Sequence, residues 1–342
     1  NERAECSPDL KGLKVLDRGA YGWEEYAAHA PCGDAGAVRR YYRRTGAILC
    51  LAYALDGSDF HHENLIACGE YPVLVDLETL LHPRPDVPFE EEYERDALAP
   101  LGERMNRSVL GTLLLPAWNR SPEGSCDIGG LFVSEEPGRV ETGRIRGIRS
   151  GGMFVREQET TASKRNAPVL DGRNVSVEAY LSDFLDGFRD MYETLLRHRD
   201  ELADPSGPLS GFRGAPVRLV FRATAVYGRL LRQSLHPKYL RDGADFALQF
   251  ETLYRAVLGP AGRKKLWPLV RKEIRDMLGM DIPFFTIRSD EKGVRLGEGG
   301  RSEDLCKASG FDRALEKIRS LSPEDCAFQL RLIRGSMDAR TA

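Results

Sequence analysis

Residues 58–79, SDFHHENLIACGEYPVLVDLET, contain two aspartates and an asparagine with the spacing that phosphoryl transfer requires. Four residues separate Asp59 from Asn64, and Asp76 follows Asn64 by twelve positions. In kinases, the first Asp accepts the proton of the attacking hydroxyl, and the Asn and second Asp hold the Mg²⁺ that bridges the phosphates. Glu78 shares one side of an extended chain with Asp76, because side chains alternate along a strand. The pattern predicts phosphoryl transfer with Asp59 as the base.

Two other interpretations of this stretch are open. His61, His62 and Glu63 suggest a metal-dependent hydrolase, but no H-E-x-x-H is present and adjacent histidines point apart on an extended chain. A polar loop satisfied by its own backbone is the second, because Asp, Asn and His favour turns. D-x-x-x-x-N alone is a weak signal. The following hairpin, Asp76 and a preceding apolar helix together favour the kinase-like interpretation.

A hairpin and a helix should position these side chains. Residues 64–67 and 73–75 are β-prone, and Gly69-Glu70-Tyr71-Pro72 between them has turn chemistry. Before the hairpin, Asp34 can cap a helix that runs to about Leu55. Four arginines would line the solvated outer face of this helix: Arg39, Arg40, Arg43 and Arg44.

The rest of the chain divides into a loop-rich and a helical region, which predicts an α+β fold. Residues 83–175 are rich in Pro, Gly, Ser and Arg, so we expect long loops and short strands, with a mobile section near residues 150–165. Beyond a candidate boundary near residue 175, helical spacing predicts helices over residues 180–196 and about 224–240. Pro268 should begin another that Gly279 ends, and Ser322 should cap the last one.

The composition limits the class of protein. The chain has 342 residues, of which 42% are apolar and 30% charged, so it can bury a sizeable core. Its net charge of -3 gives no reason to expect nucleic-acid binding. We expect no transmembrane segment, because no apolar run approaches the roughly 20 residues of a span. Seven dispersed cysteines without C-x-x-C favour reduced thiols in the cytoplasm over disulfides or a zinc site.

The loop variant narrows the class of kinase. D-x-H-x-x-N followed by V-D-L-E resembles the aminoglycoside and choline phosphotransferases more than protein kinases. No G-x-G-x-x-G precedes the loop, and the only lysines before it, Lys11 and Lys14, lack a convincing strand motif for phosphate contact. With 58 residues before Asp59, we expect the nucleotide-binding lobe to be incomplete.

Segments along nearly the whole chain carry a more particular resemblance. They read KVLDRGAYGWEEY, VRRYYRRTGAILCLAY, SDFHHENLIACGEYPVLVDLETLLHP, NAPVL, RLVFRATAVYGRLLRQSLHPKYL, DIPFF and SPEDCAFQLRLIR. Together they resemble the dehydratase domain of class II lanthipeptide synthetases of the LanM type. The resemblance implies a lipid-kinase-like fold, here mostly its C-lobe. It also implies an enzyme that phosphorylates Ser and Thr of a precursor peptide with ATP and Mg²⁺, and then eliminates phosphate to give dehydroalanine and dehydrobutyrine.

The resemblance assigns phosphorylation roles within the opening stretch. Asp59 matches the base, and His61 matches its loop partner. Asn64, Asp76 and Glu78 match the cofactor-side groups, with Asn64 and Asp76 on Mg²⁺. The sequence D-L-E stands where kinases have D-F-G.

A second set of residues matches the elimination step. Arg218 and Thr224 match the family pair in R-x-x-x-R-x-T, in which an Arg can hold the leaving phosphate through paired charge-assisted hydrogen bonds. Arg222 is a candidate for a further phosphate contact. Ala223 stands where the family usually has Pro, so the backbone there is less constrained. His236 is interpreted as a helix-end histidine rather than a catalyst.

The resemblance also predicts that the chain is a fragment of a bifunctional synthetase and is inactive alone. The family's K-P-R lysine, an earlier Asp and His used in elimination, and the zinc-binding cyclase domain have no match here. Residues 1–82 would supply the catalytic loop and metal hairpin, 83–175 an activation-like region with 139–173 as its loop, and 176–342 the elimination motif. No zinc is expected in this fragment, and the cyclase domain of the parent chain would be its partner.

Two alternatives have distinct signatures. A small-molecule phosphotransferase would need no peptide and has no use for R-x-x-x-R-x-T. A non-catalytic remnant would bind the precursor peptide without nucleotide-dependent chemistry, and the missing lysine favours it.

Overall fold

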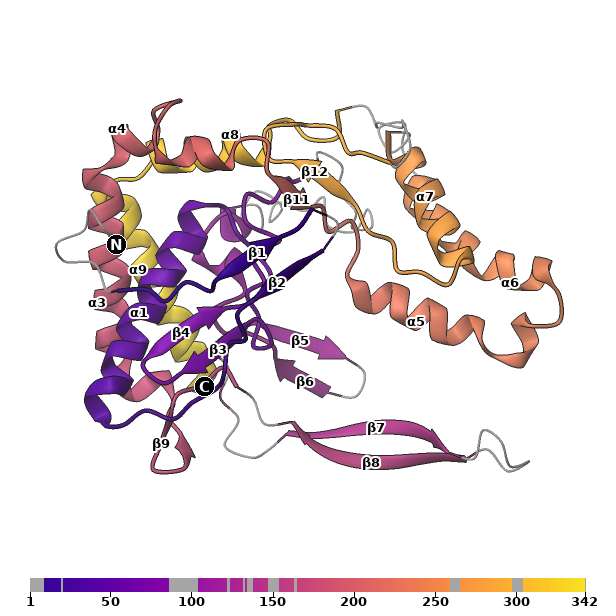
Figure 1. The fold of residues 1–342 in the computed structure, drawn as a ribbon, viewed down its shortest axis with the longest axis horizontal. Coiled ribbons are helices and arrows are strands. Elements are labelled where there is room, and N and C mark those ends of the chain that lie inside the picture. The colour runs from indigo at the N-terminus through magenta and orange to yellow at the C-terminus, as the bar shows by residue number, and fades with distance from the viewer. Residues whose placement is uncertain are drawn as a thin grey trace.

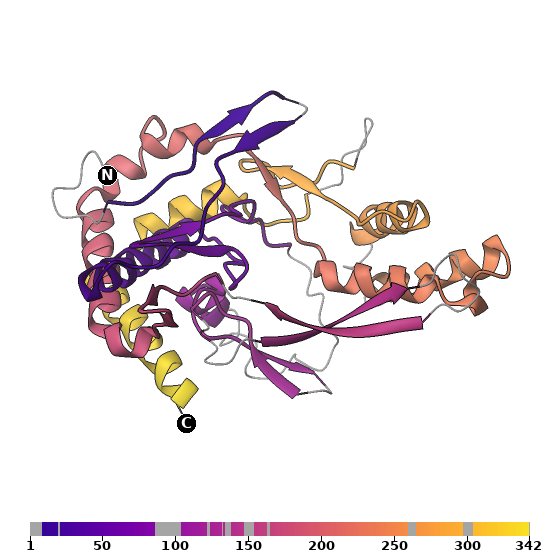
Figure 2. The same cartoon turned by 60° about the horizontal axis from the view of Figure 1, so that its bottom comes forward.

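The structure, a computed structural model, describes residues 9–19, 21–85, 104–121, 124–131, 133, 138–146, 154–162, 165–258, 265–296 and 304–341. Helix and sheet are mixed, and each sheet among these residues is an antiparallel pair of strands. Helices α1 (Ala35–Ala54), α3 (Leu181–Arg197) and α9 (Pro323–Thr341) lie together at one end (Figures 1 and 2). Helices α5 (Thr224–Ser234), α6 (Gly243–Phe250) and α7 (Trp267–Leu278) lie at the other. A kinase-like architecture stays a prediction.

Helix α1 confirms the predicted helix and its cap. Asp34 Oδ1 accepts a hydrogen bond from a backbone N–H of the first turn, at 2.7 Å. The prediction of a solvated arginine face is wrong for Arg44, which is buried. Its guanidinium donates to the Glu70 carbonyl (2.8 Å) and lies 4.0 Å from the centre of the Tyr71 ring. Arg44 therefore fastens the turn of the following hairpin to the helix.

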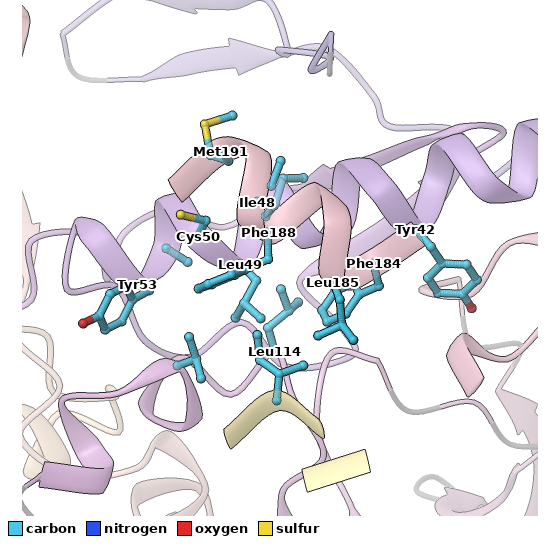
Figure 3. Packing of buried hydrophobic residues seen from close by; sticks show 14 of the residues in the cluster. Tyr42, Ile48, Leu49, Cys50, Tyr53, Leu114, Phe184, Leu185, Phe188 and Met191 are labelled. Carbon is cyan, nitrogen blue, oxygen red and sulfur yellow. The ribbon is translucent and has the colours of Figure 1, made fainter. Parts of the chain in front are cut away.

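Helices α1 and α3 cross with their backbones in contact. A Cβ atom on Gly46 would lie 2.0 Å from Phe184 O, and one on Gly187 would lie 1.8 Å from Arg43 O, so only glycine fits at either position. The crossing joins residues on both sides of the boundary expected near residue 175. Figure 3 shows the surrounding core side chains: Tyr42, Ile48, Leu49, Cys50, Tyr53, Leu114, Phe184, Leu185, Phe188 and Met191.

The predicted hairpin is strands β3 (Leu65–Cys68) and β4 (Tyr71–Leu74). Its turn is shorter than predicted: Gly69, at φ +63°, and Glu70 form it, and Pro72 lies within β4. Pro72 pairs with Ala67, whose N–H donates to Arg165 O (2.7 Å) rather than to β4. The strand therefore tolerates a residue without an N–H at this position.

The loop-rich region contains one hairpin longer than predicted. Strands β7 (Gly138–Arg146) and β8 (Phe154–Ala162) pair along nine residues each. Strand β8 lies within residues 150–165, the section that we expected to be mobile, and that mobility stays a prediction; residues 150–153, 163 and 164 lie outside the described ranges. The other pairs are short, as predicted: β5 (Trp118–Ser121) with β6 (Gly124–Asp127), and β9 (Val169–Leu170) with β10 (Arg173–Asn174).

A second core lies between helices α5 to α7 and the pair β11 (Pro216–Arg218) and β12 (Thr286–Arg288). Helix α7 confirms the predicted start near Pro268 and end at Gly279. Helix α5 ends at Ser234, earlier than predicted, because Pro237 lacks the N–H that a continuing helix requires. His236 Nδ1 instead accepts from Lys238 N (3.3 Å) and caps the next turn, which confirms its helix-end role.

The last helix begins as predicted, because the Ser322 hydroxyl accepts a hydrogen bond from Asp325 N (3.1 Å). The remaining described elements are β1 (Val15–Asp17), β2 (Gly22–Glu24), α4 (Arg199–Leu202), α8 (Gly310–Arg319), and the 3-10 helices η2 (Val109–Thr112), η3 (Val177–Tyr180), η4 (Pro208–Phe212), η5 (Pro237–Tyr239) and η6 (Glu251–Val257). None of the helices in the described ranges has the length and hydropathy of a membrane span.

Candidate active site

The loop between α1 and β3 holds Asp59 in a strained conformation. Asp59 has φ +66°, a left-handed value that non-glycine residues seldom adopt. On one side, Phe60 N donates to Thr112 O at 3.0 Å. On the other, Asn64 Nδ2 donates to Asp59 O at 2.9 Å. The surrounding structure thus maintains the strain, as is common where a side chain must be aimed at a functional site.

His61 lies beside Asp59 in this loop. Its Nδ1 accepts a hydrogen bond from Glu63 N at 3.2 Å, which places the proton of a neutral imidazole on Nε2. That nitrogen lies 4.0 Å from Asp59 Oδ1. The same nitrogen lies 3.5 Å from Asn64 Nδ2, so the His61 ring sits between the side chains of Asp59 and Asn64.

The charges around Asp59 suit a general base. Burial raises the pKa of Asp59, and the negative charge of Asp76 raises it further, whereas His61 and Arg218 lower it. The net effect is a pKa above the ordinary aspartate value. A carboxylate whose pKa is raised toward pH 7 is a stronger proton acceptor.

The exit of the hairpin places Asp76 and Glu78 differently. Asp76 Oδ1 accepts from Glu78 N (3.1 Å), and this turn orients the Asp76 side chain. The Glu78 carboxylate forms an ion pair with Arg218, whose N–H also donates to Glu78 O (3.1 Å). In this structure the expected cofactor-side acid Glu78 is therefore engaged by Arg218, and Asp76 is the exit carboxylate whose charge acts on Asp59.

The predicted elimination pair is in contact. Arg218 Nη2 donates to Thr224 Oγ1 at 3.1 Å. The Arg218 guanidinium also lies 5.4 Å from the centre of the half-exposed Phe284 ring, within cation–π range. Through Arg218 the pair reaches Glu78 and the electrostatic environment of Asp59.

Arg222 is turned away from this cluster. Its Nε donates to Glu273 Oε1 at 2.7 Å, and its Nη2 donates to Glu273 Oε2 and to Leu253 O, both at 3.2 Å. Three of its donor contacts are therefore made to protein groups. In this structure Arg222 is thus engaged by Glu273 and Leu253, and its contact with phosphate stays a prediction.

A segment of the loop-rich region that contains Asp127 and Gly130 packs against the loop that carries Asp59. Asp127 Oδ1 accepts from Ala117 N and Gly129 N, both at 2.8 Å, and closes this segment into a compact turn. A Cβ atom on Gly130 would lie 2.5 Å from Phe60 O, so the segment lies directly against the loop. The buried Asp127 carboxylate thus indirectly positions the residue after Asp59.

A buried ion-pair network fixes the end of α1. Asp56, which is 2% exposed, lies 2.7 Å from Arg313 and 2.9 Å from Lys317 of α8, and 3.6 Å from Arg84. Burial alone would raise the pKa of Asp56, but these three cations hold it well below its ordinary value. The charged Asp56 thereby joins α8 to the start of the catalytic loop.

The donor set fits Mg²⁺. After burial, the negative charge of Asp76 also raises the pKa of Asp59, and a bound cation would offset this repulsion between the two carboxylates. Asn64 uses its amide nitrogen on Asp59 O, so its amide oxygen is the atom offered to a cation. The described residues contain no group of three His, Cys, Asp or Glu side chains spaced for a metal. Mg²⁺ needs none, because it binds one or two carboxylates together with substrate phosphates.

Three residues of the site were not predicted from the sequence. They are Asp127, Glu273 and Phe284. Glu273 carries a signal that could have been used, because it interrupts the apolar stripe Leu269, Val270 and Met277 of α7. A charge at a buried helix position requires a partner elsewhere. Asp127 lies in an irregular segment without such periodicity.

Two comparisons with known proteins match the part of the chain that contains this site. The sequence profile of the family described as "Domain of unknown function (DUF4135)" matches residues 1–288, which include every site residue from Asp59 to Phe284. The chain is also similar to the lacticin 481/lactococcin biosynthesis protein LcnDR2 of Lactococcus lactis subsp. lactis, with 26% identity over 339 residues. That similarity covers 96% of this chain and 34% of the relative, so the chain spans about a third of the relative's length.

Proposed function

We propose that this chain, which belongs to the DUF4135 family, is part of an enzyme that dehydrates Ser and Thr of a precursor peptide in lanthipeptide biosynthesis. The relative's role in lacticin 481/lactococcin biosynthesis supports the pathway. One observation carries the chemistry: Arg218 connects the phosphorylation residues, through Glu78, to Thr224 of the elimination pair. A single site could then perform both steps in sequence.

In the first step, the peptide hydroxyl oxygen attacks the γ-phosphorus of ATP. The new O–P bond forms as the bond to ADP breaks, and the hydroxyl proton passes to the Asp59 carboxylate. His61, whose Nε2 lies 4.0 Å from Asp59 Oδ1, would favour the charged form of that carboxylate. Mg²⁺, held by Asn64 and Asp76, would neutralise charge on the phosphates.

In the second step, a base takes the Cα proton of the phosphorylated residue. The electron pair forms the Cα=Cβ double bond, the Cβ–O bond breaks, and phosphate leaves. Arg218 holds the departing phosphate by charge-assisted hydrogen bonds, and Thr224 orients the guanidinium. In the family that the chain resembles, this step uses an Asp and a His from a segment that has no match in the given sequence. We propose that those two residues supply the base.

The proposal extends to the whole protein. This chain would be the larger, C-lobe part of a kinase-like dehydratase domain in a cytoplasmic bifunctional synthetase. A nucleotide-binding lysine and a zinc-dependent cyclase would belong to other parts of that synthetase. The chain alone would then be inactive, and its activity must be tested in the complete gene product.

Mass spectrometry of a precursor peptide encoded beside the gene tests the proposal. The complete gene product is incubated with the peptide, ATP and Mg²⁺. Loss of one water per modified residue is expected for the wild type, an unmodified peptide for Asp59→Ala, and accumulated phosphopeptide for Arg218→Ala. Glu63→Ala and Arg229→Ala, which alter exposed residues of the same loop and of α5, should resemble the wild type.

Other outcomes select the alternatives. ATP consumption with an amino alcohol or aminoglycoside, and none that depends on peptide, would identify a small-molecule phosphotransferase. A folded complete protein that binds the peptide and leaves it unmodified would identify a non-catalytic remnant. Either result overturns the dehydratase proposal.

A further inference from the structure

Glu273 is a fully buried carboxylate outside the reacting cluster. It lies on the inner face of α7, and its side chain is 0% exposed. Burial raises the pKa of Glu273, and its hydrogen bonds from Arg222 and Tyr227 oppose that effect. A buried carboxylate with charge-assisted partners on another element usually fixes that element in place.

Both partners of Glu273 flank Thr224 in sequence. Arg222, two residues before Thr224, forms a two-point contact with the carboxylate, at 2.7 and 3.2 Å. Tyr227, three residues after Thr224, donates its hydroxyl to Glu273 Oε1 at 2.5 Å. One side chain therefore restrains the chain on each side of Thr224.

Apolar packing also restrains this part of the chain, because Phe221 and Tyr227 lie in the second core and Leu230 and Leu231 pack against it. Thr224 is exposed, and the residue before it makes no side-chain hydrogen bond that caps α5. Of the α5 residues, Tyr227 and Ser234 are the buried ones among those described. Glu273 adds to this packing the directed polar contacts at the start of α5, through Arg222 and Tyr227.

We propose that Glu273 is a positioning residue that sets the contact between Arg218 and Thr224 and thereby serves phosphate elimination. The inference rests on the proposed function. Its partners hold residues 222–227, which places Thr224 Oγ1 3.1 Å from the Arg218 guanidinium. Within the part of the chain that the structure describes, the hydrogen bonds and ion pair of Glu273 run to Arg222 and Tyr227 and none reaches Asp59, Asn64 or Asp76, so phosphorylation should be insensitive to Glu273.

If Glu273 has this role, its substitution should change the ratio between the rate of phosphate elimination and the rate of peptide phosphorylation. Displacing a positioned group by about 1 Å can slow a reaction roughly 100-fold, so elimination should fall by about 10- to 100-fold while phosphorylation is kept. A purely structural role would slow both steps together or lower the amount of folded protein. The phosphopeptide that accumulates is therefore the diagnostic species.

The experiment follows the precursor peptide in time, using the complete gene product with ATP and Mg²⁺. Glu273→Gln removes the charge and keeps the shape, and Tyr227→Phe removes a single hydroxyl, so at least one should fold. Asp276→Asn is the matched control, since Asp276 lies on the same helix and pairs with Lys272 instead. Circular dichroism confirms folding of each variant.

We expect phosphopeptide to accumulate with Glu273→Gln and, to a smaller extent, with Tyr227→Phe, and not with Asp276→Asn. Wild-type product ratios in both folded variants, or equal slowing of both steps, would overturn the inference. If the wild-type enzyme itself does not dehydrate the peptide, the proposed function fails instead. The two failures are therefore distinguishable.

Discussion

Glu78 and Arg218 form an ion pair that joins the exit of the β3–β4 hairpin to strand β11. The two residues are also linked by a backbone hydrogen bond from Arg218 N to Glu78 O at 3.1 Å. Arg218 in turn donates to Thr224 at 3.1 Å. Arg218 therefore contacts a residue of the proposed phosphorylation site, Glu78, and one of the proposed elimination site, Thr224. A bound phosphate would have to compete with the Glu78 carboxylate for the positive charge of Arg218.

Glu78→Gln should strengthen phosphopeptide binding. The substitution removes the carboxylate that neutralises Arg218 and leaves the backbone hydrogen bond in place. A partly exposed ion pair is worth up to about 1 kcal/mol, so the affinity should rise roughly two- to five-fold. Isothermal titration of a phosphoserine peptide into the complete protein measures this. Glu63→Gln serves as the control, and an unchanged or weaker affinity in Glu78→Gln would contradict competition for Arg218.

Asp59→Asn should stabilise the protein at neutral pH while abolishing peptide phosphorylation. Burial and Asp76 raise the pKa of Asp59 in the folded state, so between its unfolded and folded pKa the folded protein binds more protons. The free energy of unfolding therefore decreases as the pH rises through that window. Above it, the charged Asp59 carboxylate continues to destabilise the folded protein. Asparagine removes this cost. Thermal unfolding should show a higher midpoint for Asp59→Asn at pH 7, and a difference that shrinks below pH 4 would confirm the cause. A lower midpoint at pH 7 would sink the idea.

Local features of the fold could be predicted from the sequence because their causes lie within a few residues. The Asp34 and Ser322 caps and the β3–β4 hairpin depend on neighbouring residues. Asp59 and Asn64 likewise meet within one loop. These elements were predicted with small errors at their ends.

Long-range charge pairing could not be predicted in the same way. Arg44 was expected in solvent, yet it packs on the hairpin turn. Arg222 finds its partner Glu273 51 residues later, and Glu78 finds Arg218 140 residues later. A single sequence shows that such groups need partners, but only the folded chain shows which partners they have.

Gly187→Ala should strongly destabilise the protein. A Cβ atom there would lie 1.8 Å from Arg43 O in the crossing of α1 and α3, so the two helices must separate. Overpacking of this kind typically costs about 1–3 kcal/mol. Gly228→Ala is the matched control, because Gly228 lies in α5 with open space around it. That control should stabilise by roughly 0.5–1 kcal/mol, since alanine favours the helix. Urea unfolding measures both, and equal stabilities would contradict the close crossing.

His82 should make stability fall as the medium becomes acidic. Burial and the neighbouring cation Arg84 lower the pKa of His82 to about 4, and its Nε2 accepts a hydrogen bond from Val220 N at 3.3 Å. An unfolded histidine has a pKa of about 6.5, so between that value and 4 the unfolded chain binds a proton that the folded protein does not. The free energy of unfolding should therefore decrease as the pH falls through this window. His82→Gln should be less stable than the wild type at pH 7, and its free energy of unfolding should change less between pH 6.5 and 4. Urea unfolding at several pH values measures how the free energy of unfolding changes with pH in each protein. Equal changes in the wild type and His82→Gln would mean that His82 is already protonated or solvated in the folded protein.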